Sequence, residues 1–140
     1  MKLSLSALCM SLLTFFAVTN TFAYEDKYLK GFWAMKPLVN GIANVDYYDG
    51  NNKNTLYIFT CDFNQKTSSS NEEPEEADYH VKDGIIYLNY PELGKEFKRE
   101  FKIKALSKNN LVLEEEVLPE IVLTFEYERV DSVKNLCPTN

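Results

Sequence analysis

The side chains that most often perform acid–base or nucleophilic chemistry are scarce in this chain. Its 140 residues contain one histidine, His80, and three cysteines. His80 alternates with Tyr79 and Val81, which predicts that its ring faces solvent, and a lone exposed histidine is typical of a surface residue rather than of a base or metal ligand. The sequence has no Gly-rich phosphate loop, no HExxH and no GxSxG. We therefore expect no enzymatic activity, no metal site and no cofactor.

Arg99 points instead to a binding function. It alternates with the apolar face of the strand-like segment 97–106, and a charge on a buried face needs a partner or a ligand. The candidate ligand-binding residues that we expect to face a common interior are Tyr47, Tyr87, Arg99, Phe101, Glu115 and Tyr127. Together they suit a small ligand that is hydrophobic or carries an anionic head group. In the alternative interpretation, Arg99 pairs with Glu115 and the tyrosines fill the core.

A second candidate site lies on a polar stretch, residues 64–78, which is long for a connection between strands. It begins with serines and then carries the acidic candidates Glu72, Glu73, Glu75 and Glu76. Such an arm could meet a basic protein partner, as in a periplasmic enzyme inhibitor or a toxin immunity protein. The other interpretation is a solvated connector that increases solubility.

The N-terminal residues predict export. Lys2 gives a positive start, residues 3–18 are mostly apolar, and Thr21-Phe22-Ala23 fits a cleavage site. We interpret residues 1–23 as a signal peptide that is removed near Ala23, which leaves no membrane span in the mature chain. The mature protein is then expected in the periplasm or outside the cell.

Residues 24–140 fit one domain. Loss of the leader removes Cys9 and leaves Cys61 and Cys137, an even pair that predicts one disulfide in an exported protein. Two separate buried thiols are the alternative. Loss of Lys2 shifts the net charge from −6 to about −7, and an acidic surface without a basic cluster argues against nucleic-acid binding.

The elements that must position these residues are strands. Aromatic residues make up 14% of the chain, and hairpin signals such as Asn40-Gly41 and Asp83-Gly84 divide it into sequential segments. The expected strands are residues 32–39, 42–48, 55–63, 77–81, 85–90, 97–106, 111–117 and 121–130. This pattern predicts an all-β, eight-stranded antiparallel up-and-down barrel, because closure removes exposed strand edges. Residues 24–30 add a short N-terminal helical turn.

Gly31, Trp33 and Arg129 frame this pattern. A Gly-x-Trp at the first strand and an arginine at the end of the last one resemble the signature of lipocalin-like barrels of the calycin superfamily. The resemblance implies that Arg129 packs over Trp33 and that these three residues are structural. A cation over an indole is worth about 1 to 2 kcal/mol when shielded from water. With its short tail after residue 130, the chain is most similar to small secreted bacterial members of this superfamily. The resemblance implies non-catalytic ligand binding in or at the mouth of the barrel.

Overall fold

The computed structural model describes residues 26–38, 41–62, 67–69, 73–91 and 97–133. It contains a 3₁₀ turn and nine strands, which are η1 Asp26–Tyr28, β1 Gly31–Met35, β2 Ile42–Tyr48, β3 Lys53–Asp62, β4 Thr67–Ser69, β5 Glu75–Lys82, β6 Ile85–Tyr90, β7 Phe97–Leu106, β8 Asn110–Leu118 and β9 Ile121–Val130. None of the helical segments in these ranges has the length and hydropathy needed to cross a bilayer. The predicted leader, Cys137 and Glu72 lie outside the described residues.

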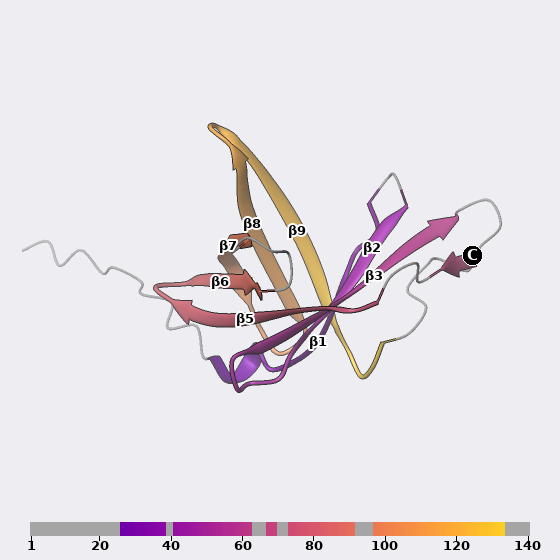
Figure 1. Ribbon diagram of the computed structural model, residues 1–140, viewed down its shortest axis with the longest axis horizontal. Helices are drawn as coiled ribbons and strands as arrows, with labels where there is room; N and C mark the ends of the chain where they lie inside the picture. The colour runs from indigo at the N-terminus through magenta and orange to yellow at the C-terminus, as the bar shows by residue number, and fades with distance from the viewer. Residues whose placement is uncertain (1–25, 39–40, 63–66, 70–72, 92–96, 134–140) are drawn as a thin grey trace, which may run out of the picture.

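Eight of these strands form a closed ring. Each pairs antiparallel with the next in the order β1, β2, β3, β5, β6, β7, β8, β9, and β9 pairs back onto β1. Strand β4 lies outside the ring and pairs only with the end of β3. The prediction of an all-β, eight-stranded up-and-down barrel preceded by a short helical turn is therefore confirmed (Figure 1).

Local sequence explains where strands turn and end. Asp83 and Gly84 both have positive φ, 53° and 75°, as the predicted two-residue hairpin between β5 and β6 requires. Strand β1 stops at Met35 rather than at residue 39. Pro37 accounts for the difference because it has no N–H to donate to a neighbouring strand.

The prediction of one long polar loop over residues 64–78 is wrong in its extent. Thr67–Ser69 forms β4, and β5 already begins at Glu75. Beyond Leu56, where its pairing with β5 stops, β3 presents an open edge, and β4 pairs with that edge at Thr60–Asp62. Unpaired backbone groups favour such strand addition.

Trp33 closes one end of the barrel. Its side chain is fully buried, and its indole N–H donates to the carbonyl of Leu29 at 2.7 Å. Leu29 follows η1 and is itself buried in the interior cluster. The helical turn therefore seals this end of the barrel, and Trp33 is the side chain that holds it there.

Arg129 lies over Trp33, as predicted, with the guanidinium 4.3 Å from the ring centre. The same group donates to the carbonyls of Tyr28, of Lys30 at 2.7 Å and of Lys108 at 2.5 Å. These carbonyls belong to the entry turn and to the β7–β8 turn. A single side chain of β9 thus connects the entry turn, Trp33 of β1 and the β7–β8 turn at the closed end.

Gly31 is explained by the same arrangement. Its φ of +127° is rarely adopted by other residues, and a Cβ at this position would collide with Nη1 of Arg129. The Gly-x-Trp spacing therefore leaves room for the arginine beside the tryptophan that the arginine covers.

Apolar side chains pack on both sides of the β1–β3 wall. The interior cluster includes Trp33, Tyr48 and Leu111, whereas a second cluster on the outside is formed by Ala34, Ala43, Val45, Phe59 and Cys61. Val133, in the tail after β9, packs against the second cluster. This explains why the sequence of β3 is apolar on both faces: Leu56 and Ile58 line the interior, and Phe59 faces the outer cluster.

The clasp at the closed end can be tested by mutation. We expect Arg129→Ala and Gly31→Ala each to lower the free energy of unfolding by about 2 to 3 kcal/mol, because charged hydrogen bonds and the cation–π contact are lost or displaced. Urea denaturation measures the effect. Glu128→Ala, at the neighbouring exposed position on β9, is the matched control and should change stability by less than about 0.5 kcal/mol. An Arg129→Ala protein as stable as wild type would contradict the clasp.

Candidate functional site

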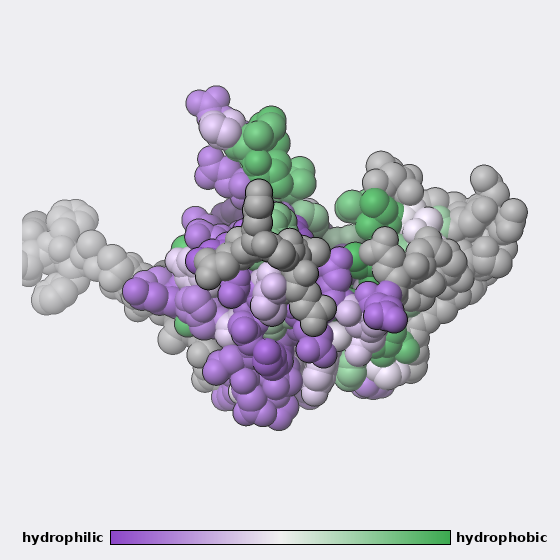
Figure 2. Space-filling model, in the orientation of Figure 1, coloured by the Kyte–Doolittle hydropathy of each residue, from purple (hydrophilic) through white to green (hydrophobic). Residues whose placement is uncertain are grey.

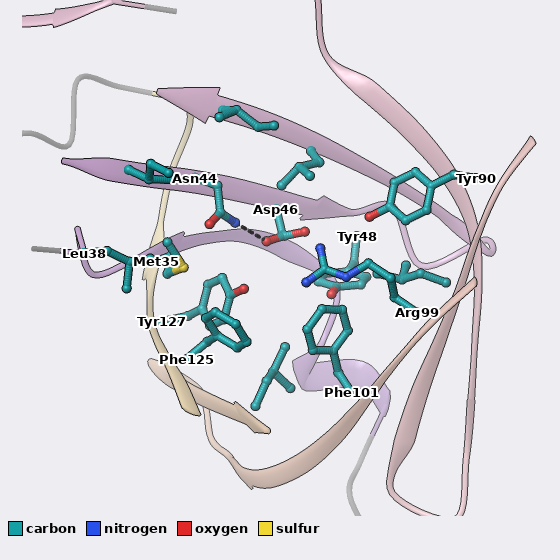
Figure 3. Close-up of a pocket in the computed structure, with 15 residues that line it drawn as sticks. Met35, Leu38, Asn44, Asp46, Tyr48, Tyr90, Arg99, Phe101, Phe125 and Tyr127 are labelled. Atoms are coloured by element: carbon teal, nitrogen blue, oxygen red, sulfur yellow. Dashed lines mark hydrogen bonds between the residues drawn. The ribbon is translucent and has the colours of Figure 1, made fainter. Parts of the chain in front are cut away.

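The end of the barrel opposite Trp33 holds a cavity. Its volume is about 190 Å³, and its apolar walls include Met35, Leu88, Leu113 and Phe125 (Figure 3). These side chains come from β1, β6, β8 and β9, so the cavity belongs to the barrel interior and not to a single hairpin.

The rim of this end is hydrophobic. The large apolar side chains that are most exposed in the described part of the chain are Leu38, Ile42, Phe97, Val117, Leu118, Ile121, Val122 and Leu123. Strand direction places all of them at the open end: Leu38 follows β1, Val117 and Leu118 end β8, and Ile42, Phe97 and residues 121–123 begin β2, β7 and β9. Figure 1 shows the β8–β9 hairpin projecting beyond the rest of the barrel, and Figure 2 shows its hydrophobic side chains gathered on the side that faces β2 and β3.

A gap between β7 and β8 widens this mouth. The two strands pair only from Lys102 and Glu114 toward the closed end. Toward the open end they separate around a hollow of about 730 Å³ lined by residues of both strands and of the β8–β9 turn. Arg99 lines both this hollow and the cavity.

Arg99 and Glu115 bridge that gap. Arg99 Nε donates to Glu115 Oε1 at 2.8 Å, and Nη2 donates to Oε2 at 2.6 Å. Burial alone would lower the pKa of Arg99, but the hydrogen bond and charge of Glu115 outweigh it and raise this pKa above its ordinary value. The two-point geometry is the strong form of a carboxylate–arginine pair, and it follows the alternative in which Arg99 pairs with Glu115.

Asp46 is the buried acid of the cavity. It is 6% exposed and accepts hydrogen bonds from Asn44 Nδ2 at 2.6 Å and from Asn54 Nδ2 at 3.2 Å. Burial raises the pKa of Asp46 to about 6, although the hydrogen bonds of Asn54 and Tyr127 and the charge of Arg99 lower it. Figure 3 shows its carboxylate and the Arg99 guanidinium pointing toward one another across the cavity.

Three phenols complete the polar lining, namely Tyr48, Tyr90 and Tyr127. Burial raises the pKa of each above its ordinary value, with the charge of Asp46 as a further cause. These tyrosines are therefore neutral in the folded protein at physiological pH and act as hydrogen-bonding groups.

The structure brings four of the six predicted ligand-binding residues to the interior side of the wall: Arg99, Phe101, Glu115 and Tyr127. The expectation that Tyr47 and Tyr87 face inward is wrong. Tyr47 stacks on Phe32 with ring centres 4.3 Å apart, and Tyr87 stacks on His80 at 4.8 Å. Because residues alternate along a strand, these pairs lie on the outer face, opposite to Tyr48 and Leu88.

Sequence reasoning missed Asp46, Asn44, Tyr48 and Tyr90. A usable signal was present for the first three: Trp33 faces inward, and pairing through the β1–β2 hairpin places Asp46 directly opposite it. Directly opposed residues share a face of the sheet, so residues 44, 46 and 48 follow Trp33 into the interior.

The acidic candidates do not form one exposed arm in the described residues. Glu73 is exposed, whereas Glu75 and Glu76 lie in β5, opposite Leu56 and Thr55 of β3. Glu75 shares the face of Leu56 and is therefore directed to the barrel interior. No group of three or more histidine, cysteine, aspartate or glutamate side chains within the described ranges could hold a metal ion.

Neither a protein-family model, nor a curated protein, nor a solved structure matches this chain. The function of the protein is therefore inferred from the geometry of the open end.

Asp46 should make stability depend on pH. Its pKa is about 6 in the folded protein against 3.8 for a free side chain, so the folded state holds this proton more tightly. Its stabilising contribution is therefore complete below the unfolded value and is lost as the pH rises through about 6, a difference of about 3 kcal/mol. We expect Asp46→Asn to raise the free energy of unfolding by about 1 to 3 kcal/mol at about pH 8 and to change it little at about pH 4.

Chemical denaturation at the two pH values measures this effect. Asp131→Asn, the same substitution at an exposed position, is the control and should show no such difference. Equal effects of Asp46→Asn at both pH values would mean that the buried charge does not destabilise the fold.

Proposed function

We propose that this protein is a non-catalytic binding protein that takes a small, mainly apolar ligand through the open end of the barrel. The observation that carries the proposal is the coincidence of the cavity with the exposed hydrophobic rim at one end of the molecule. Contiguous exposed apolar surface beside a cavity with a few polar groups is typical of ligand sites.

The dimensions restrict the ligand. A cavity of about 190 Å³ is smaller than the roughly 300 to 1,000 Å³ of sites that enclose drug-sized molecules. A short or narrow ligand therefore fits inside, and any longer apolar part lies along Leu38, Ile42 and Leu123 at the rim. Burial of this part would contribute about 25 cal/mol per Å².

The setting that we propose for this activity is an exported, lipocalin-like barrel. The leader-like residues 1–23 and the Gly31, Trp33 and Arg129 arrangement support it. We also propose the Cys61–Cys137 disulfide, because Cys61 is buried in the outer cluster against which Val133 of the same tail packs. A basic protein partner for the acidic segment remains an alternative without a comparable structural observation.

The disulfide gives a direct chemical test. Intact-mass measurement of the exported protein should give a chain that begins at Tyr24 and is lighter by two hydrogens than its reduced form. Reduction should lower the free energy of unfolding by roughly 4 kcal/mol, because the bond closes a long loop. Two alkylatable thiols in the exported protein before reduction would contradict the proposed bond.

Ligand binding can be tested at the rim. We expect the protein to bind a fluorescent apolar probe, 1-anilinonaphthalene-8-sulfonate or its uncharged N-phenylnaphthylamine analogue, and the double variant Ile42→Glu/Leu123→Glu to weaken binding about tenfold by making the rim polar. Both positions are exposed, so the fold should be retained. Tyr87→Ser, on the outer face, is the control and should bind as wild type does. Equal binding by the rim variant would place the probe elsewhere.

A further inference from the structure

We propose that the ligand carries a cationic head group, such as a protonated primary amine, which pairs with the carboxylate of Asp46 inside the barrel. This inference rests on the proposed ligand-binding function and names the chemical class of the ligand. It reverses the expectation from the sequence that an anionic head group would meet Arg99.

The positive charge of Arg99 is already paired with Glu115. Its Nε and Nη2 both donate to Glu115, and its guanidinium also lies 4.6 Å from the ring centre of Phe101. The pair spans the gap between β7 and β8, where the backbone pairing has ended. A ligand carboxylate would have to displace Glu115 and thereby leave a buried carboxylate without its cation, which is costly.

The carboxylate of Asp46 faces the Arg99 guanidinium across the cavity but forms no ion pair with it, because that guanidinium donates to Glu115. Its hydrogen-bond donors are the amides of Asn44 and Asn54 and the phenol of Tyr127, which are all neutral. Within the described residues no cation forms an ion pair with it. A carboxylate offers about four acceptor positions, so three neutral donors leave one position for a donor on a ligand.

The charged side chains in and around the cavity carry an excess of negative charge. Asp46 and Arg99 line the cavity itself, and two further carboxylates lie on the inward face beyond its lining: Glu115, which pairs with Arg99, and Glu75, which shares the face of Leu56. An ammonium group would reduce this excess, whereas a carboxylate would increase it. Because Asp46 is buried, such a difference favours the cation.

A neutral side chain at position 46 could meet the structural requirements of this site. An asparagine at position 46 would keep one acceptor oxygen for the Asn44 amide, which donates to Asp46. Rotation of the Asn54 amide, whose Oδ1 is buried with no hydrogen-bond partner, would turn that oxygen toward the new NH₂ group. Packing and hydrogen bonding therefore do not require a carboxylate here. A cationic ligand does.

Three ligands of equal length test the proposal: octylamine, octanol and octanoate. We expect displacement of N-phenylnaphthylamine at about pH 7.5 to rank octylamine at least about tenfold above octanol, with octanoate weakest. Asp46→Asn should remove this preference, so that octylamine binds no more tightly than octanol. Asp131→Asn is the matched control for loss of a carboxylate at an exposed site and should leave the ranking unchanged.

A pH series adds a second readout. The groups that face Asp46 are Tyr48, Tyr90, Arg99, Glu115, Glu75 and Tyr127. Octylamine affinity should fall by up to about tenfold per unit as the pH drops below about 6, because Asp46 takes up a proton. Octanol, which carries no charge, reports any effect of the other groups and should bind equally across this range.

The outcomes separate the two proposals. Equal affinity for the three ligands, or tightest binding of octanoate, would leave ligand binding intact and overturn the assignment to a cation. Unchanged octylamine binding by Asp46→Asn would overturn it as well. If none of the three ligands and neither of the apolar probes binds the wild-type protein, the proposed function itself is wrong.

Discussion

Closure of the barrel depends on the guanidinium of Arg129. β1 and β9 are the first and last strands of the ring, and their pairing is the one that converts a meander into a barrel. Arg129 reinforces this pairing by covering Trp33 and by donating to carbonyls of the entry turn and the β7–β8 turn. Gly31 is required at its position because any side chain would occupy the space of that guanidinium. Gly31 and Trp33 in the first strand and Arg129 in the last are thus explained by one interaction.

Concentrating the closure at one end leaves the other end free. At the closed end, backbone carbonyls accept hydrogen bonds from the Trp33 indole and the Arg129 guanidinium, and η1 covers the interior. At the open end, β7 and β8 separate, and the β8–β9 hairpin extends beyond its neighbours with apolar side chains toward the mouth. The Arg99–Glu115 pair joins the two separated strands across this gap. The molecule therefore keeps a stable scaffold and an accessible interior in different places.

The fold could be predicted from the sequence because hairpin turns and alternating strands are local signals, and the clasp adds one long-range constraint. The direction of Tyr87 could also have been predicted, since the Asp83-Gly84 turn pairs it with the outward-facing His80. Asp46 was harder, because its strand β2 carries apolar residues on both faces: the interior on one side and the outer cluster with Val45 on the other. The alternation of residues then does not show which face of β2 is the interior one. Only the pairing register with Trp33 places Asp46 inside the barrel. The cavity could not be predicted, because it depends on how strands separate beyond their last paired residues.

Asp46 is a charged group that the barrel scaffold alone does not need. Its burial raises its pKa and so favours the protonated fold, which means that the ionised form weakens the protein at neutral pH. Natural proteins tolerate such local losses where a site requires them. The neighbours of Asp46 also argue for a role in binding, because Asn44, Asn54 and Tyr127 orient the carboxylate without neutralising it. Arg99, the only cation lining the described cavity, is held by Glu115. The arrangement maintains a negative charge in an apolar cavity below a hydrophobic rim, and the complement of that arrangement is an apolar molecule with a positive end.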